Sequence, residues 1–125
     1  MRIIGLDPGL HKTGWGIIDL DGNHLSHVDD GTVVTDRLSS LAERLVQLQQ
    51  SLIEVISRFQ PNEAAIEETF VNVNPLSTLK LGQARGIVMV VPASQGIPVS
   101  EYTPNLVKKT IVGSGHARKE QIQMM

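Results

Sequence analysis

Short apolar runs and longer amphipathic segments alternate along this chain. Runs rich in aliphatic and β-branched side chains, bounded by turn residues, predict strands. These runs are residues 3–6, 13–20, 24–34, 63–67 and 97–102. Apolar positions spaced three to four apart predict helices between the later strands. The pattern therefore predicts three strands in succession, followed by helices and strands in alternation.

The helices are predicted from their spacing and from their end signals. Apolar residues of the first helix fall on one stripe, at Leu41, Leu45, Leu48, Leu52, Val55, Ile56 and Phe59. Thr35 or Asp36 is suited to cap its start. Asn74 and Pro75 begin a second helix, which runs toward Pro92. The remaining predicted helices are residues 103–112 and residues from 118 onward.

This order of elements is typical of the ribonuclease H-like fold. Asp21-Gly22-Asn23 is hairpin turn chemistry, so the first three strands are expected to be antiparallel. Helix, strand, helix and strand then follow, which predicts parallel strands. We expect one α/β domain over residues 1–125, with a five-stranded mixed sheet flanked by helices. In that layout the first strand is central and the fourth lies beside it.

Two carboxylates stand at the ends of those two strands. Asp7 closes the run that begins at Ile3 and is followed at once by Pro8 and Gly9, while Glu67 closes the run 63–67. Carboxylates held side by side repel unless a cation lies between them, so the pair predicts a divalent-metal site for phosphodiester chemistry. Glu68 competes with Glu67, because side chains alternate along a strand and periodicity does not choose between them.

Composition and charge limit the classes of protein to which this chain can belong. The chain has 125 residues, 41% of them hydrophobic, a mean hydropathy of -0.01 and no cysteine, which excludes a disulfide scaffold and a thiolate metal site. We expect a cytosolic protein without a signal peptide or membrane span. Residues 1–102 hold 7 basic and 12 acidic side chains, whereas residues 103–125 hold 4 basic and 1 acidic. This basic end is either a solvated helix or an edge that contacts phosphate.

Four segments resemble one family. They are IIGLDPGLHKTGWGI at 3–17, AAIEETF at 64–70, LKLGQARG at 79–86 and KKTIVG at 108–113. In this collinear order, over essentially the whole chain, they are similar to the bacterial RuvC family of dimeric Holliday junction resolvases. The resemblance implies an endonuclease of recombination and repair that nicks four-way junction DNA symmetrically and leaves 5′-phosphates.

The resemblance also implies the site residues. It assigns catalysis and metal binding to Asp7 and Glu67 and not to Glu68. The complete site is expected to hold two Mg²⁺ ions, with Mn²⁺ as a substitute. The DNA-contacting residues implied by the match and by the basic segment are Phe70, Lys108, His116, Arg118 and Lys119.

The implied partners are a four-way junction, a second copy of the chain and a branch-migration helicase complex. Gly82 and Gly86 lie on the helix that the family uses at its dimer interface, whereas Lys80 on the same helix is interpreted as a solvated side chain. The expected location is the bacterial cytoplasm, in association with the nucleoid.

One departure from the family keeps two alternatives open. RuvC proteins complete their metal site with two aspartates on a C-terminal helix, but here no aspartate follows Asp36, and only Glu101 and Glu120 follow Glu68. We therefore expect a C-terminally incomplete domain whose catalytic helix is missing and whose cleavage is weak or absent. The alternatives are a module that binds junctions without cutting them and an actin-like ATPase domain, whose first strand ends in similar turn chemistry.

Overall fold

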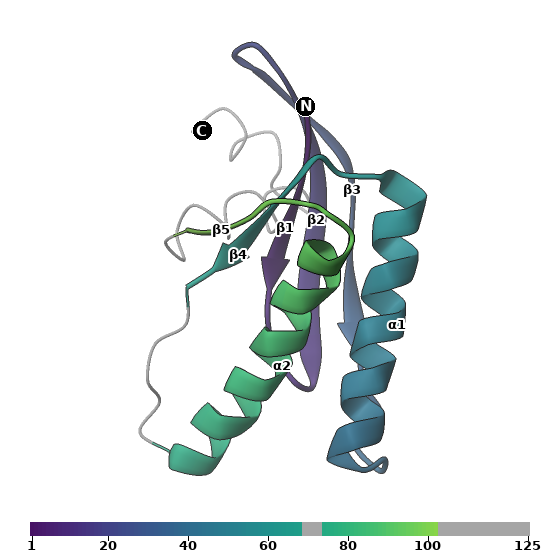
Figure 1. Ribbon diagram of the computed structural model, residues 1–125, viewed down its shortest axis with the longest axis vertical. Coiled ribbons are helices and arrows are strands. Elements are labelled where there is room, and N and C mark those ends of the chain that lie inside the picture. The colour runs from purple at the N-terminus through teal and green to yellow at the C-terminus, as the bar shows by residue number, and fades with distance from the viewer. Residues whose placement is uncertain (69–73, 103–125) are drawn as a thin grey trace.

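The computed structural model describes residues 1–68 and 74–102, in which two helices cover one face of a five-stranded sheet (Figure 1). In chain order the elements are β1 Arg2–Asp7, β2 Lys12–Asp21, β3 His24–Val34, α1 Leu41–Phe59, β4 Glu63–Glu67, α2 Pro75–Ser94 and β5 Val99–Tyr102. The order across the sheet is β3-β2-β1-β4-β5. Neighbours among β1, β2 and β3 are antiparallel, whereas β4 is parallel to β1 and β5 is parallel to β4. The predicted fold is confirmed.

The core lies between the sheet and the two helices. Ile4 and Leu6 of β1 and Ile66 of β4 are fully buried, and they belong to one apolar cluster with Leu52 of α1 and Val88 of α2. Because side chains alternate along a strand, the residues between them face the opposite side of the sheet. The helix-facing side therefore holds the core, and the other side carries the second set of strand residues.

Helix α1 begins later than predicted. Its N-cap is Ser40, whose Oγ accepts a hydrogen bond from the Glu43 backbone N–H (3.2 Å) and donates to Glu43 Oε1 (3.1 Å). The prediction of Thr35 or Asp36 as the cap was wrong because both side chains have other partners. Thr35 bonds to the turn after β1, and Asp36 accepts from the Leu38 N–H (2.9 Å) in a turn of its own. The Ser-x-x-Glu capping box was present in the sequence.

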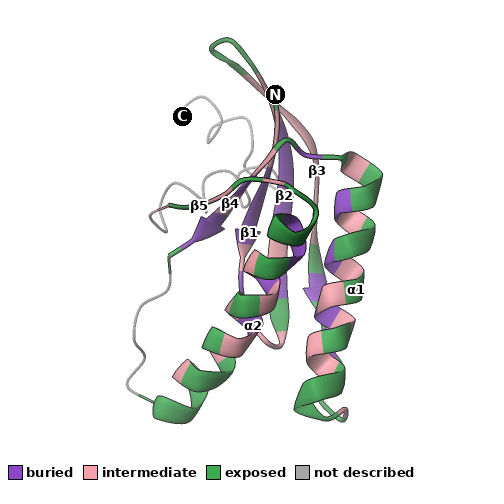
Figure 2. Cartoon of the chain, in the orientation of Figure 1, coloured by how far each residue is buried: buried purple, intermediate pink, exposed green. Residues whose placement is uncertain are grey.

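Helix α2 starts as predicted, with Asn74 as N-cap and Pro75 in its first turn. Its first turns are largely exposed, and its buried positions begin at Ala84 (Figure 2). Strand β5 is shorter than predicted, Val99–Tyr102 instead of 97–102. The reason is that the Ile97 N–H bonds the carbonyl of Pro92 (3.1 Å) at the end of α2 and is therefore used by the helix end.

Candidate active site

The two predicted carboxylates come together at the centre of the sheet. Leu6 of β1 pairs with Ile66 of β4 in parallel register, and Asp7 and Glu67 are the next residue on each strand. Leu6 and Ile66 face the helices, so Asp7 and Glu67 face the opposite side. Asp7 is half-buried and Glu67 is 7% exposed. The sheet thus presents two carboxylates on one face, at the carboxyl ends of its central strands.

The neighbouring glutamates lie elsewhere. Glu68 follows the last residue of β4, is exposed, and its backbone N–H bonds the carbonyl of Tyr102 (2.9 Å). Glu101 stands opposite Ile66 on β5 and forms an ion pair with Arg85 of α2, on the helix side of the sheet. Neither glutamate shares the arrangement that brings Asp7 and Glu67 together. The register thus places Glu67, and not Glu68, on the same face as Asp7.

A buried threonine holds the turn that follows Asp7. Thr13 is fully buried, and its Oγ1 donates to the Gly9 carbonyl (2.7 Å) and accepts from the Gly9 N–H (3.2 Å). A Cβ on Gly9 would lie 2.3 Å from the backbone oxygen of Lys12, so only glycine fits there. The Thr13 hydroxyl closes the loop across its base, and this fixes the backbone within two residues of Asp7.

A second buried threonine ties the same turn to α1. Thr35 is 3% exposed; its Oγ1 donates to the Leu10 carbonyl (2.6 Å), and its N–H bonds the His11 carbonyl (3.1 Å). Arg44 of α1 donates from Nε to the same hydroxyl (3.0 Å). The turn at residues 8–11 is therefore held by β2, by the segment after β3 and by α1. Such fixed geometry suits a site that must position a ligand within fractions of an ångström.

Sequence reasoning missed both threonines. Thr13 lies four residues after Gly9, at the start of the strand that follows a tight hairpin loop, which is a local signal that a hydroxyl could close the loop. Thr35 bonds a carbonyl 25 residues earlier in the chain, and no local pattern predicts such a partner. Both act through the backbone of the turn.

The basic side chains near the turn shape its electrostatics. His11 accepts at Nδ1 from Arg37 Nε (3.2 Å). The pKa of His11 is lowered, first because partial burial disfavours the imidazolium and then because Arg37, Lys12 and Arg44 repel a further positive charge. His11 is therefore held toward its neutral form, in positive surroundings close to Asp7.

The described residues supply two carboxylates to this site. Within residues 1–68 and 74–102 there is no group of three or more His, Cys, Asp or Glu side chains that could hold a metal ion. Two oxygen ligands on rigid strands suit a hard cation such as Mg²⁺, which keeps several waters when it binds proteins. The donor set of Asp7 and Glu67 therefore fits such an ion as part of a larger ligand shell.

The predicted DNA-contacting residues lie outside the described part of the chain. These residues are Phe70, Lys108, His116, Arg118 and Lys119. Gly82 and Gly86 lie on the exposed side of α2, where a Cβ on either would meet nothing within 4 Å. These assignments stay predictions.

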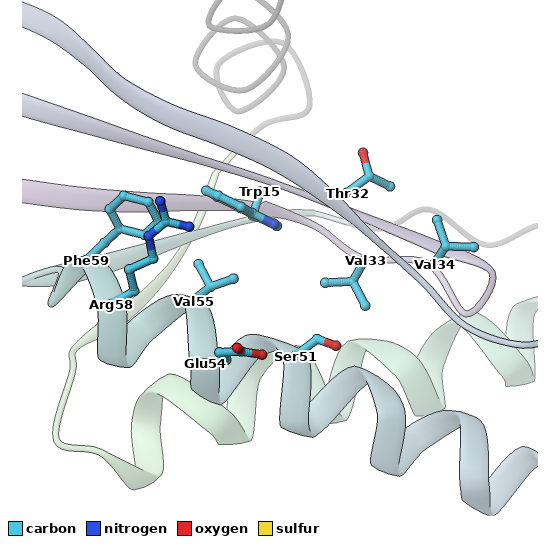
Figure 3. A pocket seen from close by; sticks show the side chains of 9 residues that line it. All are labelled: Trp15, Thr32, Val33, Val34, Ser51, Glu54, Val55, Arg58 and Phe59. Carbon is cyan, nitrogen blue, oxygen red and sulfur yellow. The ribbon is translucent and has the colours of Figure 1, made fainter.

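A hollow on the helix side of the sheet is separate from this site. It has a volume of about 300 Å³ and lies between β2, β3 and α1, with the indole of Trp15 and the ring of Phe59 in its wall (Figure 3). The two ring centroids are 5.6 Å apart. Its lining residues are Trp15, Thr32, Val33, Val34, Ser51, Glu54, Val55, Arg58 and Phe59. Asp7 and Glu67 face the other side of the sheet, so this hollow takes no part in their chemistry.

A mixed sheet of this order, with carboxylates closing β1 and β4, is the arrangement of a ribonuclease H-like domain. The family model described as crossover junction endodeoxyribonuclease RuvC matches residues 3–125. The chain belongs to the RuvC family of crossover junction endodeoxyribonucleases. This membership favours the nuclease interpretation over the actin-like ATPase alternative.

Two relatives align with this chain over its whole length. The crossover junction endodeoxyribonuclease RuvC of Paramagnetospirillum magneticum is 62% identical over 125 residues, which are 100% of this chain and 75% of that protein. The protein of the same name from Azorhizobium caulinodans is 58% identical over the same 125 residues and 74% of its own length. The chain thus spans about three quarters of these relatives.

Solved structures show the same fold. Thermus thermophilus RuvC in complex with a Holliday junction substrate matches 90% of this chain and 72% of that chain, at 29% identity and a TM-score of 0.78. A second Thermus thermophilus RuvC structure matches 97% of this chain and 75% of that one, at 32% identity and a TM-score of 0.75. The yeast mitochondrial Holliday junction resolvase Ydc2, 10% identical with a TM-score of 0.62, shares the fold alone.

Neither helix of the described residues has the length and apolar character required to cross a membrane.

Proposed function

We propose that this domain resolves four-way junction DNA in recombination and repair, by symmetric nicking that leaves 5′-phosphates. One observation carries the proposal: Asp7 and Glu67 end adjacent parallel strands at the sheet centre and face the same side. The family membership supports this chemistry, and a related RuvC structure contains a Holliday junction substrate. The described carboxylates are the residues to which we assign catalysis.

Asp7 and Glu67 would hold Mg²⁺, two ions in the complete site, with Mn²⁺ as a substitute. When bound, such ions neutralise the phosphodiester and lower the pKa of the water that attacks it. The protein's own contribution is positional. The β1–β4 register sets the spacing of the two carboxylates, and Thr13 fixes the turn beyond Asp7, so that little reorganisation is needed when substrate arrives.

DNA contacts are proposed for the remaining sequence-predicted residues. These are Phe70 for stacking on a base near the branch point, and Lys108, His116, Arg118 and Lys119 for phosphates. They rest on the resemblance and on the basic balance of residues 103–125. Action on chromosomal DNA would place the protein in the bacterial cytoplasm, at the nucleoid, together with a branch-migration helicase complex.

Symmetric nicking requires two sites, and we propose that α2 forms the two-fold interface that pairs them. Leu76, Leu79 and Val90 of α2 are each more than half exposed, at 59%, 59% and 54%. Gly82 and Gly86 lie on the same helix with open space above them, which permits close approach of a partner helix. An exposed apolar stripe of this kind supports a protein contact.

The test compares three carboxylate variants in a version of the domain extended by the family's C-terminal helix with its two aspartates, because Asp7 and Glu67 alone are expected to support weak cleavage or none. Asp7→Asn and Glu67→Gln should each lower junction cleavage by roughly 10²-fold or more, because each removes a charged ligand. Junction binding in EDTA should stay unchanged, since phosphate contacts remain. Glu68→Gln is the matched control, because it removes the same charge from the adjacent, exposed position. It should leave cleavage near the wild-type rate.

Two outcomes would contradict parts of the proposal. An inactive Glu68→Gln beside an active Glu67→Gln would show that the assignment from strand register is wrong. Calorimetry of Mg²⁺ binding provides a readout besides cleavage, and Asp7→Asn should weaken the ion's affinity. A wild-type protein that binds junctions and Mg²⁺ but makes no nick would support the binding-only alternative.

A further inference from the structure

A hollow of about 400 Å³ lies beside the turn that follows Asp7, where this turn meets the starts of α1 and α2. Its lining residues are Leu10, His11, Arg37, Arg44, Ser77, Lys80 and Leu81. None of them is acidic. We call this hollow the loop groove.

Three cations from different parts of the chain share the loop groove. Arg37 precedes α1, Arg44 is in its first turn, and Lys80 is on α2. In residues 1–68 and 74–102 the ion pairs are Arg2–Asp19, His27–Asp30 and Arg85–Glu101. The cations of the groove therefore have no carboxylate partner within the described ranges. Like charges gathered in this way raise the free energy of the protein unless an anion joins them.

The two arginines are already oriented. Arg37 uses Nε to bond His11 Nδ1 (3.2 Å), and Arg44 uses Nε to bond Thr35 Oγ1 (3.0 Å). For both side chains, no hydrogen bond from the terminal amino groups is found among the described residues. A guanidinium held at Nε presents these groups to solvent in a fixed plane, and that geometry suits a phosphate.

The groove is close to the proposed scissile position. His11 lies four residues after Asp7, so their Cα atoms are separated by at most about 14 Å. At a rise of about 3.4 Å per nucleotide, this distance covers about four nucleotides. Asp7 and the loop groove both lie at the end of the sheet that is formed by the carboxyl ends of β1 and β4.

We propose that the loop groove binds a backbone phosphate of the substrate DNA, a few nucleotides from the phosphate that is cut. This inference rests on the proposed nuclease function and adds a second anchoring point, on the helix side of the turn. Arg37 and Arg44 bind the phosphate, and Lys80 contributes a further positive charge from α2. Because Thr35 bonds both Arg44 and the Leu10 carbonyl, a phosphate bound by Arg44 is connected through Thr35 to the turn that follows Asp7.

The experiment measures junction affinity against salt. Arg37→Gln and Lys80→Gln, singly and together, remove exposed charges from the groove, and Arg58→Gln removes one at the far end of α1 as the matched control. A labelled synthetic four-way junction is titrated in EDTA at several NaCl concentrations. Each single groove variant should reduce the slope of log affinity against log salt by up to about 0.9, which weakens binding up to about eightfold at 0.1 M salt, and the double variant should lose at least as much as either single one.

A modified substrate locates the contact. Junctions that carry one neutral methylphosphonate are compared at each position within about four nucleotides of the cut site. At one position the methylphosphonate should weaken junction binding by the wild-type protein as much as Arg37→Gln does. With the methylphosphonate at that position, Arg37→Gln should cause no further loss of affinity. Thermal melts verify that each variant is folded.

The outcomes separate the two proposals. If the wild-type protein binds junctions and the groove variants have the same affinity and salt slope as Arg58→Gln, the groove inference is overturned and the nuclease proposal stands. Groove variants that dissociate a dimer but keep the wild-type salt slope would also overturn it, because a second copy would then cover the groove. A wild-type protein with no affinity for junctions would refute the proposed function and the groove inference with it.

Discussion

Replacing Thr13 tests whether the turn after Asp7 must be held by a hydroxyl. Thr13→Val keeps the shape of a fully buried side chain but removes both hydrogen bonds to Gly9, at 2.7 and 3.2 Å. Each net hydrogen bond contributes about 1 kcal/mol, and the buried backbone groups left behind add to the loss. We therefore expect Thr13→Val to lower the free energy of unfolding by about 2–3 kcal/mol.

Thr13→Ser is the matched control. It keeps the hydroxyl and loses one buried methyl group, which should cost about 1 kcal/mol. Cleavage should separate the variants more strongly than stability does. If the turn positions Asp7, Thr13→Val should cut junctions at least about tenfold more slowly, since a displacement of 1 Å can cost about 10²-fold. Thr13→Ser should remain close to wild type.

The assays use features of this chain. Trp15 is the single tryptophan and is 9% exposed, so its fluorescence reports urea unfolding. Cleavage is measured in the same version extended by the family's C-terminal helix, at a temperature at which both variants are fully folded. Junction binding in EDTA shows whether substrate still docks. Equal unfolding free energies and equal cleavage rates for the valine and serine variants would refute the argument that the hydroxyl closes the turn.

Three further predictions concern packing and charge. Gly86→Ala should stabilise the monomer by up to about 1 kcal/mol in dilute thermal melts, because its Cβ meets nothing within 4 Å. Sedimentation at higher concentration should show a weaker dimer, and an unchanged dimer would exclude this face of α2. Gly31→Ala would place a Cβ 2.6 Å from the Trp15 indole and should cost about 1–3 kcal/mol, with a shift in Trp15 emission. The hydrogen bond from Arg2 lowers the pKa of Asp19 below the ordinary value of 3.8. The stability that this ion pair contributes is therefore present above pH 3.8 and is lost as the pH falls through the lower pKa of the folded protein. Asp19→Asn should flatten that part of the pH–stability curve.

The sequence alone was sufficient for the strand order and for the positions of the two carboxylates. Alternating apolar runs and hairpin turn residues are local signals, and they placed Asp7 and Glu67 at strand ends correctly. Asn74 and Pro75 were likewise predicted as the start of α2, because capping depends on neighbours within one turn. The start of α1 was predicted wrongly even though its capping box at Ser40 was also local.

Tertiary structure decided which side chains lie together. The face shared by Asp7 and Glu67 follows from the β1–β4 register, which joins residues 60 positions apart. Thr35 was expected at a helix cap, but it bonds the turn after β1 instead. Lys80 was interpreted as a solvated side chain, and the fold places it in one groove with Arg37. Local patterns record interactions within a few residues, whereas these contacts exist only after the strands have paired and both helices have docked on the sheet.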